Sequence, residues 1–114
     1  MSTTTARIAV LEAIDRFCDM ATDHPSTPKN TWGDVVFYAD NPGKNVTRIV
    51  CATLRPDGRL DSQSVHAFVD NFTGDLFKAA GWKAPAKNAR GNIVTGWDDV
   101  VARFDWAGGY LYAR

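Results

Sequence analysis

Three turn signals divide the middle of the chain into segments that are joined by short connections. Asn41-Pro42-Gly43-Lys44, Pro56-Asp57-Gly58 and Asn71-Phe72-Thr73-Gly74 follow one another at fifteen-residue intervals. Asn and Gly tolerate the positive φ angles of a tight hairpin, and Pro fixes the φ angle of a turn residue. Because a parallel return needs a crossover of about a dozen residues or more, the segments between these turns are predicted to pair as antiparallel neighbours.

The segments beside the turns have the composition of strands. Val46–Leu54 is rich in β-branched residues, and Trp32–Ala39 is apolar and partly aromatic. Two further strands are predicted around the third turn, at Ser64–Asp70 and Asp75–Ala80. These four strands predict a meander in sequence order, and Tyr110–Tyr112 is predicted to add a short fifth strand near the end of the chain.

Two amphipathic segments flank the predicted sheet. Residues 6–21 carry apolar side chains every three or four positions, and this predicted helix must end before His24-Pro25, since proline disfavours helical conformation in the residue ahead of it. Thr95-Gly96-Trp97-Asp98 is a helix-start signal, and it predicts a short second helix that ends near Asp105.

Together the elements predict one α+β domain over residues 1–114, in the order α-β-β-β-β-α-β. Its antiparallel four- to five-stranded meander sheet is expected to have the N-terminal helix and the short C-terminal helix packed on one face. The other face is expected to stay partly open to water, with Arg48, His66 and Lys78 on it or at its edge. That placement depends on register, because a slip of one residue moves a side chain to the opposite face.

Composition predicts a cytoplasmic protein that does not enter membranes. Thirteen basic and thirteen acidic residues give a net charge of zero, which provides no bulk attraction to nucleic acid or to a membrane surface. No apolar run approaches the roughly twenty residues that cross a bilayer, and the N-terminus lacks the pattern of a secretory signal. Cys18 and Cys51 have no metal or redox spacing, so both are predicted to be reduced, buried thiols.

The charges are unevenly distributed along the chain. Residues 1–40 contain three basic and six acidic residues, residues 41–90 contain eight and four, and residues 91–114 contain two and three. A net of +4 in the middle segment favours one basic surface, although a mixed, solvated exterior would give the same count. Trp32 and Trp106 lie near the ends of predicted elements and are expected in the core.

Motifs of catalysis are absent from the sequence. It has no Gly-x-Ser-x-Gly, no Walker-type loop, no Cys–His nucleophile spacing and no His-Glu-x-x-His motif. His66 on a strand has two interpretations, as a ligand-contacting group or as a hydrogen-bonded sheet residue. We therefore expect a protein that is not an enzyme and that uses no cofactor or metal.

The segment Gly81–Arg90 is the strongest binding-site hypothesis. Trp82, Lys83, Lys87 and Arg90 lie on a loop that Pro85 stiffens, and Lys78 precedes them with no acidic residue in between. A tryptophan beside cations can stack a planar group while the cations contact phosphate. In the alternative interpretation, Trp82 covers an edge of the sheet and the lysines keep a loop soluble.

The same region carries a resemblance. SVHAFVDNFTGDLFKAAGWKAPAKNARGNI, with the closing GGYLYAR, resembles a group of short, mostly uncharacterised proteins encoded by tailed bacteriophages, and KAAGWKAPAK is its most specific part. The resemblance covers residues 62–93 and 108–114. It implies an intracellular life in an infected bacterium and brings no activity, fold or site residue with it.

Two functions from different classes fit these observations. The first is a non-enzymatic phage accessory protein that binds a host macromolecule or an anionic small molecule such as a nucleotide, in a counter-defence or host-takeover role. The second is a nucleic-acid-binding module that uses the basic face of the sheet, which the zero net charge disfavours. Edge strands of a small open sheet are natural dimer contacts, so a homodimer is compatible with either function.

Overall fold

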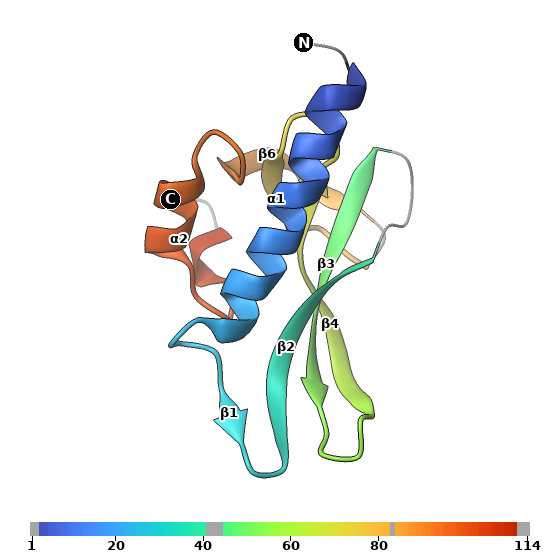
Figure 1. Cartoon of the computed structure of the whole chain (residues 1–114), viewed down its shortest axis with the longest axis vertical. Coiled ribbons are helices and arrows are strands. Elements are labelled where there is room, and N and C mark those ends of the chain that lie inside the picture. Colours follow the sequence, from blue (N-terminus) through green and yellow to red (C-terminus); the bar gives the residue numbers. More distant parts are fainter. Residues whose placement is uncertain (1–2, 41–44, 83, 112–114) are drawn as a thin grey trace.

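A six-stranded antiparallel sheet, in which each strand pairs with the next along the chain, is the centre of the structure (Figure 1). This computed structural model describes residues 3–40, 45–82 and 84–111. Its strands are β1 (Lys29–Asn30), β2 (Gly33–Asp40), β3 (Val46–Leu54), β4 (Leu60–Asp70), β5 (Asp75–Ala79) and β6 (Pro85–Asn92). The predicted α+β class and antiparallel meander are confirmed, whereas the predicted count of four to five strands is too low.

Helices lie at both ends of the described chain. α1 (Thr3–Asp23) is longer than the predicted helix and ends directly before His24-Pro25 as expected, and α2 (Trp97–Arg103) begins at the predicted start signal. The final strand predicted at Tyr110–Tyr112 is wrong over Tyr110 and Leu111, because Gly109–Leu111 forms the 3-10 helix η1, and Tyr112 lies outside the described residues. Gly108 has a φ of 85°, and its carbonyl accepts a hydrogen bond from the Leu111 amide at 3.0 Å, so the chain turns on itself there.

The β4–β5 hairpin shows how local sequence determines a turn. Gly74 has a φ of 80°, and its amide donates to the Asp70 carbonyl at 2.9 Å. The Asp70 carboxylate accepts from the Phe72 and Thr73 amides at 2.8 and 3.0 Å, which closes the turn with a side chain. The turn predicted at 71–74 is thus confirmed, as is the one at 56–58, where Gly58 has a φ of 89°. The turn predicted at 41–44 lies outside the described residues.

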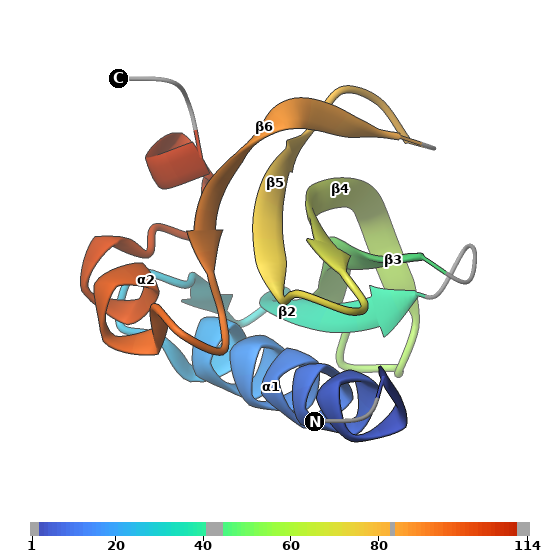
Figure 2. The same cartoon turned by 90° about the horizontal axis from the view of Figure 1, so that it is seen from above.

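One hydrophobic core joins both helical regions to residues on one face of the sheet. α1 contributes a stripe of buried side chains, and β2 to β5 contribute one or two residues each. Seen from above, β5 and β6 curve over the layer of β2 and β3, with α1 beneath β2 and α2 beside the end of β6 (Figure 2). α1 and the sheet contribute to this core Val10, Ala13, Ile14, Phe17, Cys18, Ala21, Val35, Phe37, Ile49, Ala67, Val69 and Leu76, and Ile93, Val100, Phe104 and Leu111 complete it. Val50, Ala52 and Phe68 on β3 and β4 are buried as well, outside this cluster.

Three sequence predictions about burial need correction or refinement. Trp32 and Trp106 are not core residues, since their exposed fractions are 55% and 36%. Cys18 and Cys51 are both free thiols as predicted, but only Cys18 is buried, and Cys51 is half-buried. Burial raises the pKa of the Cys18 thiol to about 12 and raises that of Cys51 as well, so both are protonated at neutral pH.

The core assignment leads to a stability prediction for α1. Phe17 is fully buried and packs edge-on against Phe104 with 5.9 Å between ring centroids, whereas Leu11 faces outward from the same helix. Phe17→Ala is expected to lower the free energy of unfolding by about 3–5 kcal/mol, because it removes a large buried group and leaves a cavity. The control Leu11→Ala is expected to change it by about 0.5 kcal/mol or less. Urea unfolding followed by circular dichroism measures both, and equal effects of the two substitutions would contradict the assigned core face.

Candidate functional site

A cavity of about 200 Å³ lies between the middle of the sheet and the segment that follows α2. It contains two residues that the sequence analysis proposed as binding residues, His66 on β4 and Lys78 on β5. The other lining residues are Cys51, Ser64, Val65, Ala79, Trp106, Ala107, Gly108 and Leu111. Among these described residues Lys78 is the one charged side chain, so the cavity offers a cation beside neutral polar groups.

His66 reaches this cavity through an irregularity in the sheet. Ile49 pairs with Ala67, but the next residue, Val50, pairs with Val65, which makes His66 an extra residue on β4. Such a bulge changes the direction in which the side chain points. His66 was expected on the open face, opposite to Ala67, and this expectation is wrong because the bulge turns its ring toward the helices.

An aromatic cluster surrounds the His66 ring. Its centroid lies 4.9 Å from that of Phe37, 5.6 Å from that of Phe104 and 6.3 Å from that of Phe17. Nε2 forms a hydrogen bond of 2.8 Å with the hydroxyl of Tyr110. Burial lowers the pKa of His66 to about 4, against a smaller opposing effect of Asp105. The imidazole is therefore neutral at pH 7 and acts in the cavity as a hydrogen-bonding group, not as a second cation.

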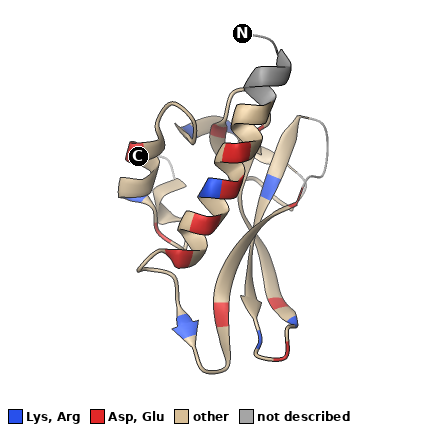
Figure 3. Ribbon diagram, viewed as in Figure 1, with Lys and Arg blue, Asp and Glu red and all other residues tan. Residues whose placement is uncertain are grey.

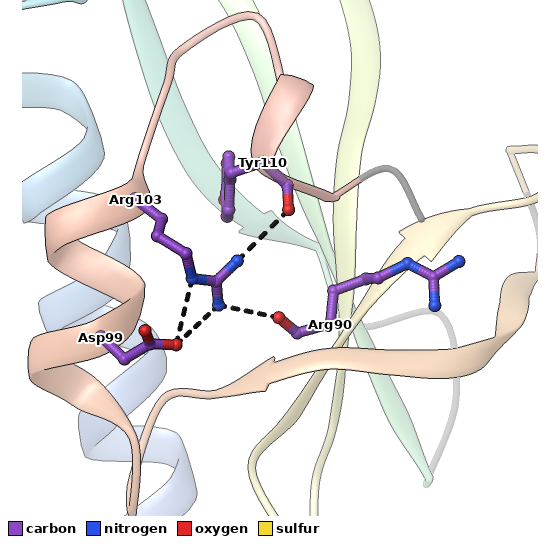
Figure 4. A network of polar contacts seen from close by, with 4 residues as sticks. All are labelled: Arg90, Asp99, Arg103 and Tyr110. Atoms are coloured by element: carbon purple, nitrogen blue, oxygen red, sulfur yellow. Dashed lines mark hydrogen bonds and ion pairs between the residues drawn. The ribbon is translucent and has the colours of Figure 1, made fainter. Parts of the chain in front are cut away.

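Two arginines hold the chain segment that forms the outer wall of the cavity (Figure 4). Arg103 donates to the backbone carbonyls of Tyr110 at 3.3 Å and Arg90 at 2.9 Å, and it pairs with the Asp99 carboxylate at 2.8 Å. Arg90 in turn donates to the Leu111 carbonyl at 2.8 Å. Arg90 was predicted to contact a ligand, whereas its guanidinium here is bonded to the backbone of the C-terminal segment.

The predicted basic loop is largely a strand. Pro85–Asn92 forms β6 and pairs with β5, so the loop expected over Gly81–Arg90 is confined to the hairpin between them. Lys87 is exposed on β6, and Lys83 lies outside the described residues. β6 pairs with β5 at Phe77↔Ala89 and Ala79↔Pro85, so Lys87 lies on the strand beside Lys78 but does not line the cavity. The described residues of the predicted site do not gather in one place.

Arg48 and Trp82 form a separate cluster. The Arg48 guanidinium lies 4.6 Å from the centroid of the Trp82 ring, donates to the Trp82 carbonyl and pairs with Asp40 at 2.6 Å. Arg48 is 8% exposed, and Trp82 is 44% exposed above it. Arg48, expected on a wet face, is therefore buried and bonded within the protein. Trp82 covers it while part of the indole remains open to solvent.

An apolar groove of about 360 Å³ adjoins the cavity, and sequence reasoning missed it. The cavity and the groove share Cys51, Ser64 and Trp106. The remaining groove residues are Pro28, Asn30, Trp32, Val35, Ala52, Thr53 and Ser62. The sequence feature that could have revealed the groove is the pair of tryptophans near the ends of predicted elements, Trp32 and Trp106, which were expected in the core.

Neither a metal-binding cluster nor a membrane-spanning helix is present within residues 3–40, 45–82 and 84–111. No group of three or more His, Cys, Asp or Glu side chains there is arranged to hold a metal ion. None of the described helices combines the length and the apolar character needed to cross a bilayer.

Comparison with known proteins gives one match. A family model described as "Family of unknown function (DUF7717)" matches residues 3–113. No curated protein and no solved structure matches the chain. The chemistry of the site must therefore be argued from its own residues.

The environment of His66 predicts how stability depends on pH. In the unfolded chain a histidine has a pKa of about 6.5, whereas the folded value is about 4. Between pH 6.5 and pH 4, His66 is mostly protonated in the unfolded state and mostly neutral in the folded state. The free energy of unfolding therefore falls by about 3 kcal/mol as the pH drops from 6.5 to 4.

The variant His66→Gln isolates this contribution, because an amide can still hydrogen-bond to Tyr110 but does not titrate. We expect wild type to lose more stability than the variant between pH 7 and pH 4.5 in urea unfolding experiments. Every other titratable group is present in both proteins, so the difference between the two pH profiles isolates the contribution of His66. Parallel pH profiles of the two proteins would show that His66 is not buried in its neutral form.

Proposed function

This chain belongs to a family of unknown function, and we propose, from the geometry of the cavity, that it is a binding protein for a small anionic molecule. The observation that carries the proposal is the placement of Lys78 in a walled cavity whose other described lining residues are uncharged. An anion in this cavity would lie beside the Lys78 cation. The proposal keeps the expected anionic ligand and places its site in the cavity instead of the predicted loop at Gly81–Arg90.

The surroundings of Lys78 strengthen its attraction for an anion. Ser64 supplies a hydroxyl, and neutral His66 supplies an imidazole whose Nε2 is engaged with Tyr110. Trp106, Ala107 and Leu111 form an apolar wall that limits solvent around the ligand. Charge-assisted hydrogen bonds are stronger in such partly desolvated sites than on an open surface.

Arg48 and Arg90, two other cations of the predicted site, do not line the cavity. Arg48 is paired with Asp40, and Arg90 is bonded to the Leu111 carbonyl. Figure 3 shows basic residues spread over several elements and acidic residues recurring along α1. Nucleic-acid affinity is built from several phosphate contacts on one surface. The geometry therefore favours a small ligand over a nucleic acid.

The wider role that we propose is that of a non-enzymatic accessory protein in a phage-infected bacterium. It is supported by the resemblance of residues 62–93 to proteins of tailed bacteriophages. A protein of this size can bind a small anionic molecule of the host with such a cavity alone, because binding requires no catalytic group. This part of the proposal is tested by expression during infection, and absence of the protein from infected cells would contradict it.

Substitution of Lys78 tests the ligand class. Lys78→Met keeps most of the length of the side chain but removes its charge, and we expect at least a tenfold loss of affinity for anionic ligands. The matched control Lys87→Met removes an exposed lysine of β6 outside the cavity and should leave affinity unchanged. Isothermal titration with inorganic phosphate, benzoate, 4-nitrophenyl phosphate and adenosine 5′-monophosphate measures the effect.

Two results would contradict the proposed function. One is no binding of any of these anions at millimolar concentration. The other is equal affinity of wild type and Lys78→Met for the anions that bind. Melting temperatures of the three proteins serve to check that the substitutions leave the fold intact.

A further inference from the structure

The apolar groove beside the cavity indicates what the rest of the ligand is. Cavity and groove meet at Cys51, Ser64 and Trp106, so one molecule can occupy both. We infer that the ligand is an aromatic anion, whose planar ring lies in the groove between Trp32 and Trp106 while its phosphate or carboxylate lies beside Lys78. This inference rests on the proposed function, and it adds the chemical class of the second half of the ligand.

The exposure of two indoles supports an aromatic occupant. Trp32 is 55% exposed and Trp106 is 36% exposed, although both line a concave, mainly apolar surface. Large aromatic side chains left open in a groove gain from contact with another flat, apolar group, and offset or edge-to-face stacking adds to the gain from burial. A ligand that was only an anion would leave this surface unused.

Trp32 is held in position before any ligand arrives. The Arg55 guanidinium lies 5.8 Å from its ring centroid, and Arg55 is itself paired with Asp61 at 2.7 Å. Pro28 adds a rigid part of the same groove. Fixed walls reduce the ordering that binding requires, which favours a preformed pocket for a rigid ring.

Polar groups in the groove favour a heteroaromatic ring over a lipid chain. Asn30, Thr53, Ser62 and Ser64 all line the groove and carry amide or hydroxyl groups. Such groups hydrogen-bond to the nitrogens and oxygens of a ring and find no partner on an alkyl chain. The groove of about 360 Å³ and the cavity of about 200 Å³ suit a compact ligand, since small-molecule sites occupy about 300–1,000 Å³.

A comparison of whole and divided ligands tests the inference. Isothermal titration of the full chain uses adenosine 5′-monophosphate, its anionic part ribose 5-phosphate and its ring part adenosine. We expect the whole nucleotide to bind at least tenfold more tightly than either part. 4-Nitrophenyl phosphate, an aryl phosphate without ribose, distinguishes a general aryl anion from a nucleotide. Tight binding of this compound supports a general aryl anion as the ligand. Weak binding of this compound, together with tight binding of adenosine 5′-monophosphate, supports a nucleotide.

Trp32→Ala is the matching variant, because the exposed indole contributes little to the core. It should weaken binding of adenosine 5′-monophosphate at least fivefold and leave binding of ribose 5-phosphate unchanged. Trp82→Ala is the control, since it removes an indole of comparable exposure outside the groove. It should not alter binding of the nucleotide.

The two proposals fail in different ways. If ribose 5-phosphate binds as well as the nucleotide and Trp32→Ala has no effect, the aromatic inference is overturned while the anion site stands. If adenosine binds as tightly as the nucleotide and Lys78→Met has no effect, the anion site is overturned and the groove alone binds. Loss of nucleotide binding in Trp82→Ala but not in Trp32→Ala would place the ring at the β5–β6 hairpin instead.

Discussion

The hydrogen bonds from Arg103 to the backbone are the interaction on which the site depends. Through them one guanidinium joins α2 to the Arg90 carbonyl of β6 and to the Tyr110 carbonyl of the C-terminal segment. Asp99, one turn earlier on α2, pairs with the same guanidinium and holds it in place. Because Tyr110 is fixed in this way, its hydroxyl can meet His66, and the segment from Trp106 to Leu111 can form a wall over the sheet.

This arrangement also explains why the basic residues do not act together. Arg90 and Arg103, both half-buried, donate to carbonyls of the C-terminal segment, and the buried Arg48 pairs with the more exposed Asp40 and lies against the Trp82 ring. Buried guanidinium groups require such partners, since an unpaired charge in the interior is strongly unfavourable. Of the basic residues in the middle of the sequence, Arg48 and Arg90 are thus bonded within the fold, Lys78 lines the cavity and Lys87 is exposed.

The sequence predicted the fold where the information is local and failed where pairing depends on distant residues. The turn at 71–74 and the end of α1 before Pro25 follow from single residues, and both were predicted correctly. β6 was missed because Pro, Gly, Asn and Lys are poor strand formers, although Pro85 stands at the first residue of an edge strand, where proline is tolerated. The bulge that turns His66 inward leaves no local signal, and the periodicity of the strand pointed to the opposite face.

The central claim is that the cavity beside Lys78, and not the hairpin near Trp82, is where this protein binds its ligand. Titration of ¹⁵N-labelled protein with adenosine 5′-monophosphate, followed by amide chemical shifts, tests it most directly. Our account predicts shifts that are concentrated at Ser64, His66, Lys78 and Gly108. Shifts confined to Trp82 and residues 87–90, or the absence of any change at millimolar nucleotide, would contradict it.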